Sequence, residues 1–223
     1  MPGNSAGQRS LTILKCWLII LLMTALQGTP ASCWGRVPPS SGKVVVVCDG
    51  DTIVLDSGEK IRYLGVDAPE VAHDRAKADC FGDEAKRMNS GLVLHKQVSL
   101  QYEREVLDPH GRFLAYVILP DGRCANLEML RAGSAYVYRT SKDFGRLTEF
   151  LQQQRQAILQ RQGMWGGCPV RQATTFIGNR RSFVFHRPEC ALGKKVATRA
   201  RNHFPDRWVG LEQGYRPCRF CKP

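Results

Sequence analysis

Short apolar runs separated by polar turn residues mark the first part of the chain, a pattern that predicts strands. Residues 43–48 are a β-branched run, residues 52–55 resume the same character, and residues 60–66 form a third apolar segment. The dipeptides Asp-Gly and Ser-Gly between these segments are typical of tight turns. The pattern therefore predicts three consecutive antiparallel strands.

Helical spacing follows these strands. Between residues 81 and 94, Ala85, Met88 and Leu92 form an apolar stripe that predicts an amphipathic helix. Further strands are predicted at 98–102 and 113–119, and further helices at 125–131 and 147–161, the last ending at Gly163. Five strands with one helix between the third and the fourth are the element order of an OB-fold barrel. We therefore expect an α+β fold, in which a five-stranded OB-fold barrel with flanking helices is followed by a small Cys/His-rich module.

The N-terminus has the layout of an export signal. Basic residues precede an apolar run at 16–26, which is shorter than a membrane-spanning helix requires. We therefore assign residues 1–32 to a signal peptide and residues 33–42 to a linker, and expect a secreted, periplasmic or membrane-attached protein. The segment Ala-Ser-Cys that ends at Cys33 also resembles the end of a bacterial lipoprotein signal, so membrane attachment through an acylated Cys33 is one alternative. An uncleaved N-terminal anchor is another.

The basic character of the chain lies mainly near its C-terminus. Of the net charge of +12, residues 171–223 carry +9 and residues 43–170 carry none. The composition, with 43% hydrophobic and 23% charged residues, excludes an intrinsically disordered chain. We therefore predict one domain at 43–170 and a basic module at 171–223. Its charge favours contact with nucleic acid or an anionic membrane. The alternative is a basic surface that contacts only solvent.

The cysteine content suits an exported protein. Of the nine cysteines, five belong neither to the signal nor to the C-terminal module: Cys33, Cys48, Cys80, Cys124 and Cys168. Four of these cysteines could form two disulfides. Any four cysteines can pair in three ways, and the sequence does not determine which pairing forms. Buried free thiols are the alternative.

Three short segments contain the residue types that phosphodiester hydrolysis requires. They are 49–52 (Asp-Gly-Asp-Thr), 62–70 (Arg-Tyr-Leu-Gly-Val-Asp-Ala-Pro-Glu) and 108–112 (Asp-Pro-His-Gly-Arg). Each alone is also common turn chemistry, so the signal lies in their order on one predicted barrel. Asp51 and Asp67 lie at adjacent strand ends, where two carboxylates suit a hard cation such as Ca²⁺.

The other polar residues of these segments suit the remaining steps of the reaction. Glu70 follows a proline in a rigid turn and suits activation of the attacking water. Arg62 and Arg112 can each donate two hydrogen bonds to phosphate oxygens, a geometry that lysine does not reproduce. We therefore predict Arg62, Glu70 and Arg112 as the catalytic residues, with the carbonyl of Ala68 and water completing the oxygen shell of the cation.

On these segments, residues 43–166 resemble the staphylococcal nuclease (thermonuclease) family. Further matching pieces are Phe81-Gly-x-Glu-Ala85, Asn126, Gly133-x-Ala135 and Gly163-x-Trp165. The resemblance implies an OB-fold and Ca²⁺-dependent endonucleolytic cleavage of DNA and RNA that leaves 3′-phosphate ends. It also implies Asp51 and Asp67 as the metal ligands, and Arg62, Glu70 and Arg112 as the catalytic set.

The chain departs from the family pattern at positions that bear on substrate contacts. Tyr136 and Tyr138 resemble the tyrosine pair that packs on the nucleotide, although a gap is needed to align them, and core packing is the alternative. His110 stands where the family commonly has an aromatic residue. Residues 71–80 replace the family's loop after the glutamate.

The C-terminal module contains a second candidate metal site. The spacing His-x-x-x-Cys followed by Cys-x-x-Cys provides four ligands that suit tetrahedral Zn²⁺: His186, Cys190, Cys218 and Cys221. The segment 214–221 resembles the small metal-binding module of the Ada DNA-repair protein, which uses four cysteines where this chain has one histidine. A disulfide between Cys218 and Cys221, or a site of three cysteines and water, remain alternatives.

Taken as a whole, the sequence predicts an exported Ca²⁺-dependent nuclease, a hydrolase that acts on DNA, RNA or both. Nucleic acid is the expected partner, and we predict no protein partner. The alternative is a catalytically inactive nucleic-acid-binding OB-fold protein. A third reading makes the C-terminal module a metal-dependent DNA-docking unit with the barrel as its scaffold.

Overall fold

The computed structural model describes residues 36–73, 77–140, 143–169 and 175–223. Residues 38–223 form one compact unit. The predicted signal peptide, residues 1–32, and Cys33 lie outside the described residues. Over the described part of the chain, no helix combines the length and the apolar character that a membrane span needs.

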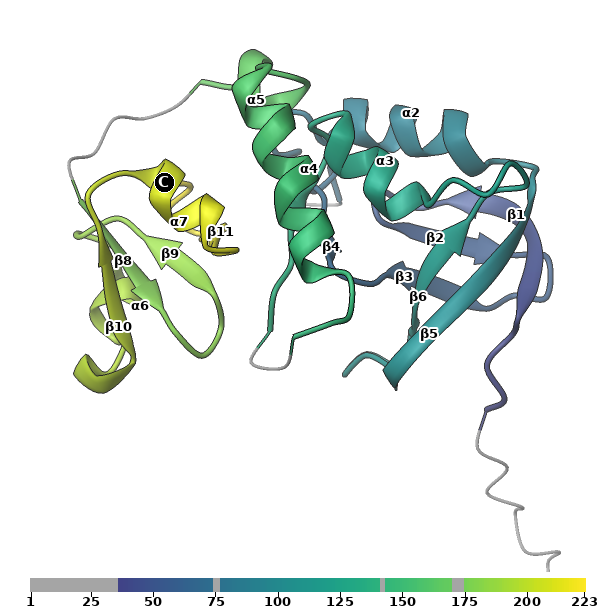
Figure 1. Ribbon diagram of the computed structural model, residues 1–223, viewed down its shortest axis with the longest axis horizontal. Coiled ribbons are helices and arrows are strands. Elements are labelled where there is room, and N and C mark those ends of the chain that lie inside the picture. The colour runs from purple at the N-terminus through teal and green to yellow at the C-terminus, as the bar shows by residue number, and fades with distance from the viewer. Residues whose placement is uncertain (1–35, 74–76, 141–142, 170–174) are drawn as a thin grey trace, which may run out of the picture. The chain divides into compact units, whose positions relative to one another are not determined.

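Five strands close into a barrel in the order β1-β2-β3-β6-β5 (Figure 1), which confirms the predicted OB-type barrel. All neighbouring strands run antiparallel except the parallel pair of β3 and β6. The strands are β1 (Ser41–Val47), β2 (Thr52–Leu55), β3 (Lys60–Tyr63), β5 (Gln97–Leu107) and β6 (Phe113–Ile118). Their inward-facing side chains form one core that includes Ile53, Ile61 and Phe113, each fully buried. The apolar runs seen in the sequence therefore supply the interior of the barrel.

The predicted third strand is wrong in one respect, because it splits in two. β3 ends at Tyr63, and the chain turns at Gly65, whose φ of 78° favours glycine. A Cβ at Gly65 would lie 2.7 Å from the Phe144 ring, so a larger residue would also clash at this turn. Beyond it, β4 (Val66–Asp67) leaves the barrel and pairs with β7 (Tyr136–Val137). This departure carries Asp67 out of the barrel wall.

Helices cover the barrel near these turns. They are α2 (Gly82–Val93), α3 (Ala125–Arg131), α4 (Leu147–Leu159) and α5 (Met164–Gly167). In Figure 1, α2 and α3 lie along the upper side of the barrel. The buried amide of Asn126 in α3 donates to the carbonyls of Leu64 and Ala115 and accepts from the amide of Val117. One side chain thus joins the end of β3 to β6 and fixes the turn that leads to Asp67.

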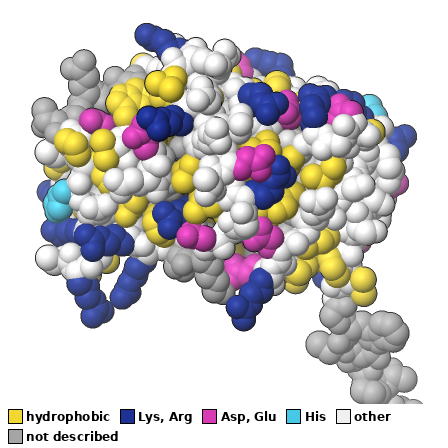
Figure 2. All heavy atoms as spheres, in the orientation of Figure 1, with side chains coloured by type: hydrophobic (Ala, Val, Ile, Leu, Met, Phe, Trp, Pro, Cys, Tyr) yellow, Lys and Arg dark blue, Asp and Glu magenta, His cyan; other side chains and the backbone are white. Residues whose placement is uncertain are grey.

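The C-terminal residues form a second, smaller sheet in the order β10-β8-β9-β11. Its elements are β8 (Phe176–Asn179), β9 (Val184–His186), α6 (Ala191–Lys194), the 3₁₀ turn η2 (Thr198–Ala200), β10 (Arg201–Phe204), α7 (Arg207–Glu212) and β11 (Arg216–Pro217). Figure 2 shows Lys and Arg side chains at many points over the left part of the view, where Figure 1 places this sheet. The location agrees with the charge distribution along the sequence.

The C-terminal sheet shares its apolar core with helices α4 and α5. Its buried residues Phe176, Phe185 and Phe204 belong to the same apolar cluster as Met164 and Trp165 of α5. The buried Gln154 of α4 makes a further connection, because its side chain accepts from the amide of Val137 and donates to the carbonyl of Leu211 in α7. The predicted domain boundary at residue 170 therefore stays a prediction. Residues on both sides of it belong to this second apolar cluster, which is separate from the barrel core.

Of the disulfides left open by the sequence, one forms among the described residues. Cys80 and Cys168 are bonded, with Cα atoms 5.9 Å apart and a sequence separation of 88. Cys48 and Cys124 are free thiols, and Cys124 is buried. For Cys48 and Cys124 the alternative of free thiols therefore holds among the described residues. Burial raises the pKa of the Cys124 thiol, as it does for an inert structural cysteine.

Candidate active site

Two aspartates meet where β2 begins and β4 ends. Asp51 precedes β2 in a tight turn, in which its backbone N–H donates to Asp49 Oδ1 at 2.9 Å. A Cβ at Gly50 would lie 2.6 Å from the Cβ of Ala68, so this turn packs directly against the end of β4. Asp51 and Asp67 are only 4% and 5% exposed. The fold therefore brings together two buried carboxylates from segments separated by two turns.

Arg62 in β3 lies between the two aspartates. Its guanidinium forms an ion pair with Asp51 and a second one with Asp67 at 3.0 Å. Burial raises the pKa of Asp51 to about 6, although the charge of Arg62 opposes that shift. Burial alone would lower the pKa of Arg62, but the two aspartates outweigh it and raise that pKa. The two buried carboxylates therefore need nearby positive charge in order to be ionised.

Glu70 lies three residues beyond Asp67, and its backbone is held on both sides. Its carbonyl accepts from the amide of Asp79 at 2.8 Å, and its own amide donates to the carboxylate of Asp79 at 3.2 Å. Gly82 at the start of α2 packs against it, since a Cβ there would lie 2.2 Å from the Glu70 carbonyl oxygen. The Glu70 side chain stays partly exposed beside the acid pair.

Arg112, the third predicted catalytic residue, forms its ion pair outside this group. Within the described residues its ion-pair partner is Asp108, at 2.7 Å. Burial would raise the pKa of Asp108, but hydrogen bonds from the backbone and the guanidinium of Arg112 lower it. The loop therefore holds Arg112 in a defined position, without bringing it into an ion pair with Asp51 or Asp67.

The two predicted substrate tyrosines are both covered by other side chains. Tyr136 packs edge-to-face against Trp165, with ring centroids 5.2 Å apart. Tyr138 lies under the guanidinium of Arg216, which is 4.9 Å from its ring centroid. Core packing therefore accounts for part of the surface of Tyr136, while Tyr138 contacts a cation from the C-terminal sheet.

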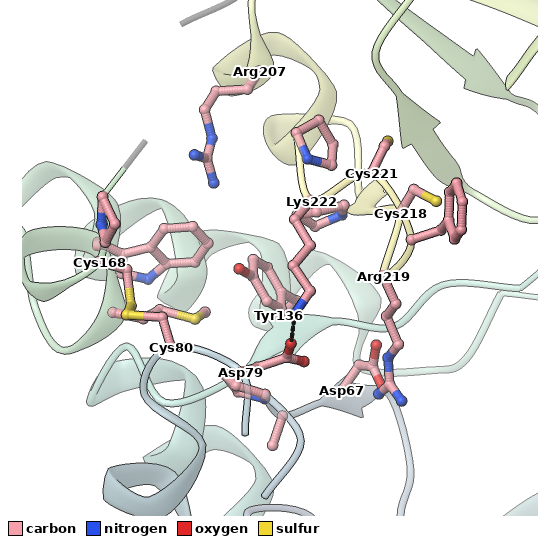
Figure 3. Close-up of a pocket in the computed structure, with 18 of the residues that line it drawn as sticks. Asp67, Asp79, Cys80, Tyr136, Cys168, Arg207, Cys218, Arg219, Cys221 and Lys222 are labelled. Carbon is pink, nitrogen blue, oxygen red and sulfur yellow. Dashed lines mark hydrogen bonds and ion pairs between the residues drawn. A yellow bond between two sulfur atoms is a disulfide. The ribbon is translucent and has the colours of Figure 1, made fainter. Parts of the chain in front are cut away.

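Three basic side chains of the C-terminal residues form ion pairs with the acidic residues, which was not predicted from the sequence. Arg219 pairs with Asp67 at 2.5 Å and with Glu70, and Arg216 pairs with Asp67 at 3.3 Å. In Figure 3, Arg219 points towards Asp67, and a dashed line joins Lys222 to Asp79, an ion pair of 2.5 Å. The only sequence signal was that Arg219 stands between two candidate metal ligands, Cys218 and Cys221.

The four candidate ligands of the C-terminal sheet form one cluster. The ligand atoms of His186, Cys190, Cys218 and Cys221 all lie within 4.8 Å of one another. The three cysteines are free thiols, so the alternative disulfide between Cys218 and Cys221 does not form. Burial and the charge of Arg216 lower the pKa of His186, which keeps the imidazole in the neutral form that binds metals. The donor set and its spacing fit tetrahedral Zn²⁺.

The sequence matches one protein family, both by the family model and by individual relatives. Residues 60–167 match the model described as staphylococcal nuclease homologue. An uncharacterized endonuclease of Escherichia coli is 38% identical over 127 residues, which cover 56% of this chain and 76% of that protein. A thermonuclease of Staphylococcus hyicus is 32% identical over 121 residues, covering 52% and 71% of the two chains. A thermonuclease of Staphylococcus intermedius is 36% identical over 92 residues, covering 40% and 54%. Asp51 lies just outside the matched model, and Asp67, Glu70 and Arg112 lie inside it.

Proposed function

Because the chain belongs to the staphylococcal nuclease family and is a hydrolytic nuclease, we propose that it is an exported, Ca²⁺-dependent enzyme that cleaves DNA, RNA or both and leaves 3′-phosphate ends. The observation that carries the metal requirement is the pair of buried carboxylates, Asp51 and Asp67. Among the described residues, the positive charges that pair with these two carboxylates all come from arginine side chains. Such a site fits a hard divalent cation, with the carbonyl of Ala68 as a further oxygen ligand.

Each residue of the group then has a chemical role. Glu70, held by its backbone beside the acid pair, takes the proton of the attacking water. Arg62, which lies between the two aspartates, would donate hydrogen bonds to the non-bridging phosphate oxygens. Arg112 contacts the same phosphate from the loop at 108–112, and both arginines stabilise the charge that develops in the transition state. A bound Ca²⁺ supplies charge neutralisation at the phosphate.

The test is hydrolysis of single-stranded DNA by the full chain, with Ca²⁺ or with EDTA. Glu70→Gln and Arg112→Ala should each lower kcat by about 10²–10³-fold, the usual loss when a transition-state contact is removed. Arg87→Ala is the matched control, because Arg87 is an exposed arginine that pairs with Glu84 on α2. Wild-type protein that binds DNA but cuts none with any divalent cation would establish the alternative, a binding protein. End-labelling of the products then identifies the position of the phosphate.

We propose further that His186, Cys190, Cys218 and Cys221 bind one Zn²⁺. The support is the convergence of the four ligand atoms and the absence of a disulfide among these three cysteines. Elemental analysis of the purified chain should find one zinc per molecule. Cys218→Ala should lose it, whereas Cys48→Ala, which replaces a free thiol outside the cluster, should keep it.

Export is supported by the N-terminal pattern and by the disulfide between Cys80 and Cys168, because such bonds persist in oxidising compartments. Membrane attachment through Cys33 belongs to the same proposal as an alternative route after export. The mass of the mature N-terminus distinguishes the two. A chain that begins near residue 33 without lipid is secreted or periplasmic, and an acylated Cys33 anchors it.

A further inference from the structure

A cavity of about 490 Å³ lies beside Asp67 (Figure 3). Its walls come from two parts of the chain: Asp67, Tyr136 and Trp165 on one side, and Arg207, Trp208 and Phe220 on the other. The last three lie outside residues 60–167, which match the family model. The C-terminal sheet and its helix α7 therefore build half of a cavity next to the proposed cation site.

Aromatic faces form much of its lining. Trp165 packs edge-to-face on Tyr136, and its ring lies 6.4 Å from that of Trp208, inclined at 56°. Trp208 is 39% exposed and Phe220 is 73% exposed, although both are large and apolar. Partly exposed aromatic rings at a cavity are a platform on which flat ligands stack, and nucleic-acid-binding proteins use them for bases.

The cavity also contains unsatisfied hydrogen-bond donors. Trp165 is 6% exposed, and its Nε1 has no partner among the described residues. The Nε of Arg207 is likewise buried without one, and Figure 3 shows this side chain pointing into the cavity. Buried polar groups almost always find a partner, so two orphan donors at one cavity indicate a ligand that offers acceptors. Arg219 and Lys222 also line the cavity, each paired with an aspartate of the lining, so among the described residues Arg207 remains as its unbalanced positive charge.

We propose that this cavity binds a base of the nucleic-acid strand next to the scissile phosphate, and that the C-terminal sheet supplies the stacking wall. The inference rests on the proposed function, since Asp67 belongs to both the cavity and the cation site. The occupant is flat, accepts hydrogen bonds at its edge and is flanked by negative charge, which are the properties of a nucleobase between phosphates. Two orphan donors favour thymine or uracil, whose edges carry carbonyl oxygens, over adenine, whose amino group is a donor.

The test compares two single-stranded octamers with the same phosphates. One is oligothymidylate and the other is its abasic analogue, and binding to the full chain is measured by fluorescence anisotropy without added Ca²⁺, so that no chelator removes the proposed zinc. Trp208→Ala and Phe220→Ala should each weaken binding of the thymine octamer by about tenfold, the usual scale of one stacked base, and leave the abasic octamer unchanged. Leu159→Ala, which removes an exposed apolar side chain from α4, is the matched control. Arg207→Lys keeps the charge but removes the Nε donor, and it should abolish a preference for thymine over adenine.

Three results would overturn the proposal. If the aromatic variants weaken both octamers equally, the C-terminal sheet contacts phosphates only. If they change neither, no base enters the cavity. If Trp208→Phe fails to restore binding to a folded chain, stacking is not the interaction. Cleavage is assayed separately with Ca²⁺. A chain that binds the thymine octamer more tightly than the abasic one but cuts neither would support the cavity proposal and contradict the proposed nuclease function. A chain that cuts DNA but does not distinguish the octamers would do the reverse.

Discussion

Replacing Arg219 with alanine should lower the Ca²⁺ concentration that gives half-maximal cleavage. The guanidinium of Arg219 pairs with Asp67 at 2.5 Å and with Glu70, so a cation that binds Asp67 must first displace it. The Arg219 side chain is 44% exposed, which limits each pair to the range of surface ion pairs, about 0.2–1 kcal/mol. Because Asp67 is buried, we expect values near the upper limit and a total of about 1–2 kcal/mol, a 5–30-fold shift.

The assay is the initial rate of cleavage of a short oligonucleotide against Ca²⁺ concentration, at saturating substrate. Calorimetric titration of Ca²⁺ into the chain without substrate gives the same shift independently. Arg199→Ala removes one exposed positive charge from the same part of the chain and is the control for net charge. A half-activation concentration for Arg219→Ala within twofold of both the wild type and this control would refute the reasoning. So would an increase, which would make Arg219 a contributor to cation or substrate binding.

Four other predictions concern positions that support the site. Cys80→Ser should lower the free energy of unfolding by about 2–4 kcal/mol in denaturant titrations, because the disulfide closes a long loop, whereas Cys48→Ser should have a small effect. Asn126→Ala should cost about 3 kcal/mol in the same assay, since it leaves the carbonyl of Leu64 and the amide of Val117 buried without their partner; an effect below 1 kcal/mol would mean that water replaces the amide. Gly82→Ala should reduce kcat at least about tenfold while the chain stays folded by circular dichroism, because the new Cβ displaces the backbone of Glu70. Chelation of zinc should lower the thermal midpoint of the wild type but not that of Cys218→Ala, and an equal shift in both would contradict the proposed ligand set.

The barrel was predictable because its signals are local. Alternation of polar and apolar residues at the start of β5 reflects two faces of one sheet, and the turn residues between strands are read directly from the sequence. The split of the third strand was not predictable, because the space at Gly65 is limited by Phe144, which is 79 residues away in sequence. The pairing of Cys80 with Cys168 has the same origin, since it depends on which segments the fold brings together.

The candidate site divides in the same way. Asp51, Arg62, Asp67 and Glu70 were predicted from their order on the barrel, and the structure places them in one group. Arg219 was not predicted as part of that group. Its position depends on how the C-terminal sheet packs, which neither its charge nor its place between two cysteines specifies. Arg112 shows the converse case, because its spacing suggests a role while its observed partner is Asp108.

The buried amide of Gln154 has a consequence for anyone who shortens this protein. A chain cut near residue 170 would leave the Gln154 side-chain amide without the Leu211 carbonyl and would expose Met164 and Trp165 to solvent. The truncated form would then be prone to self-association, and low yield or weak activity from it would report a damaged surface rather than a missing function. Point substitutions at Trp208, Phe220 or Arg219 avoid that ambiguity, since all three side chains are partly exposed. The C-terminal residues are better treated as an integral part of the nuclease than as a detachable tag.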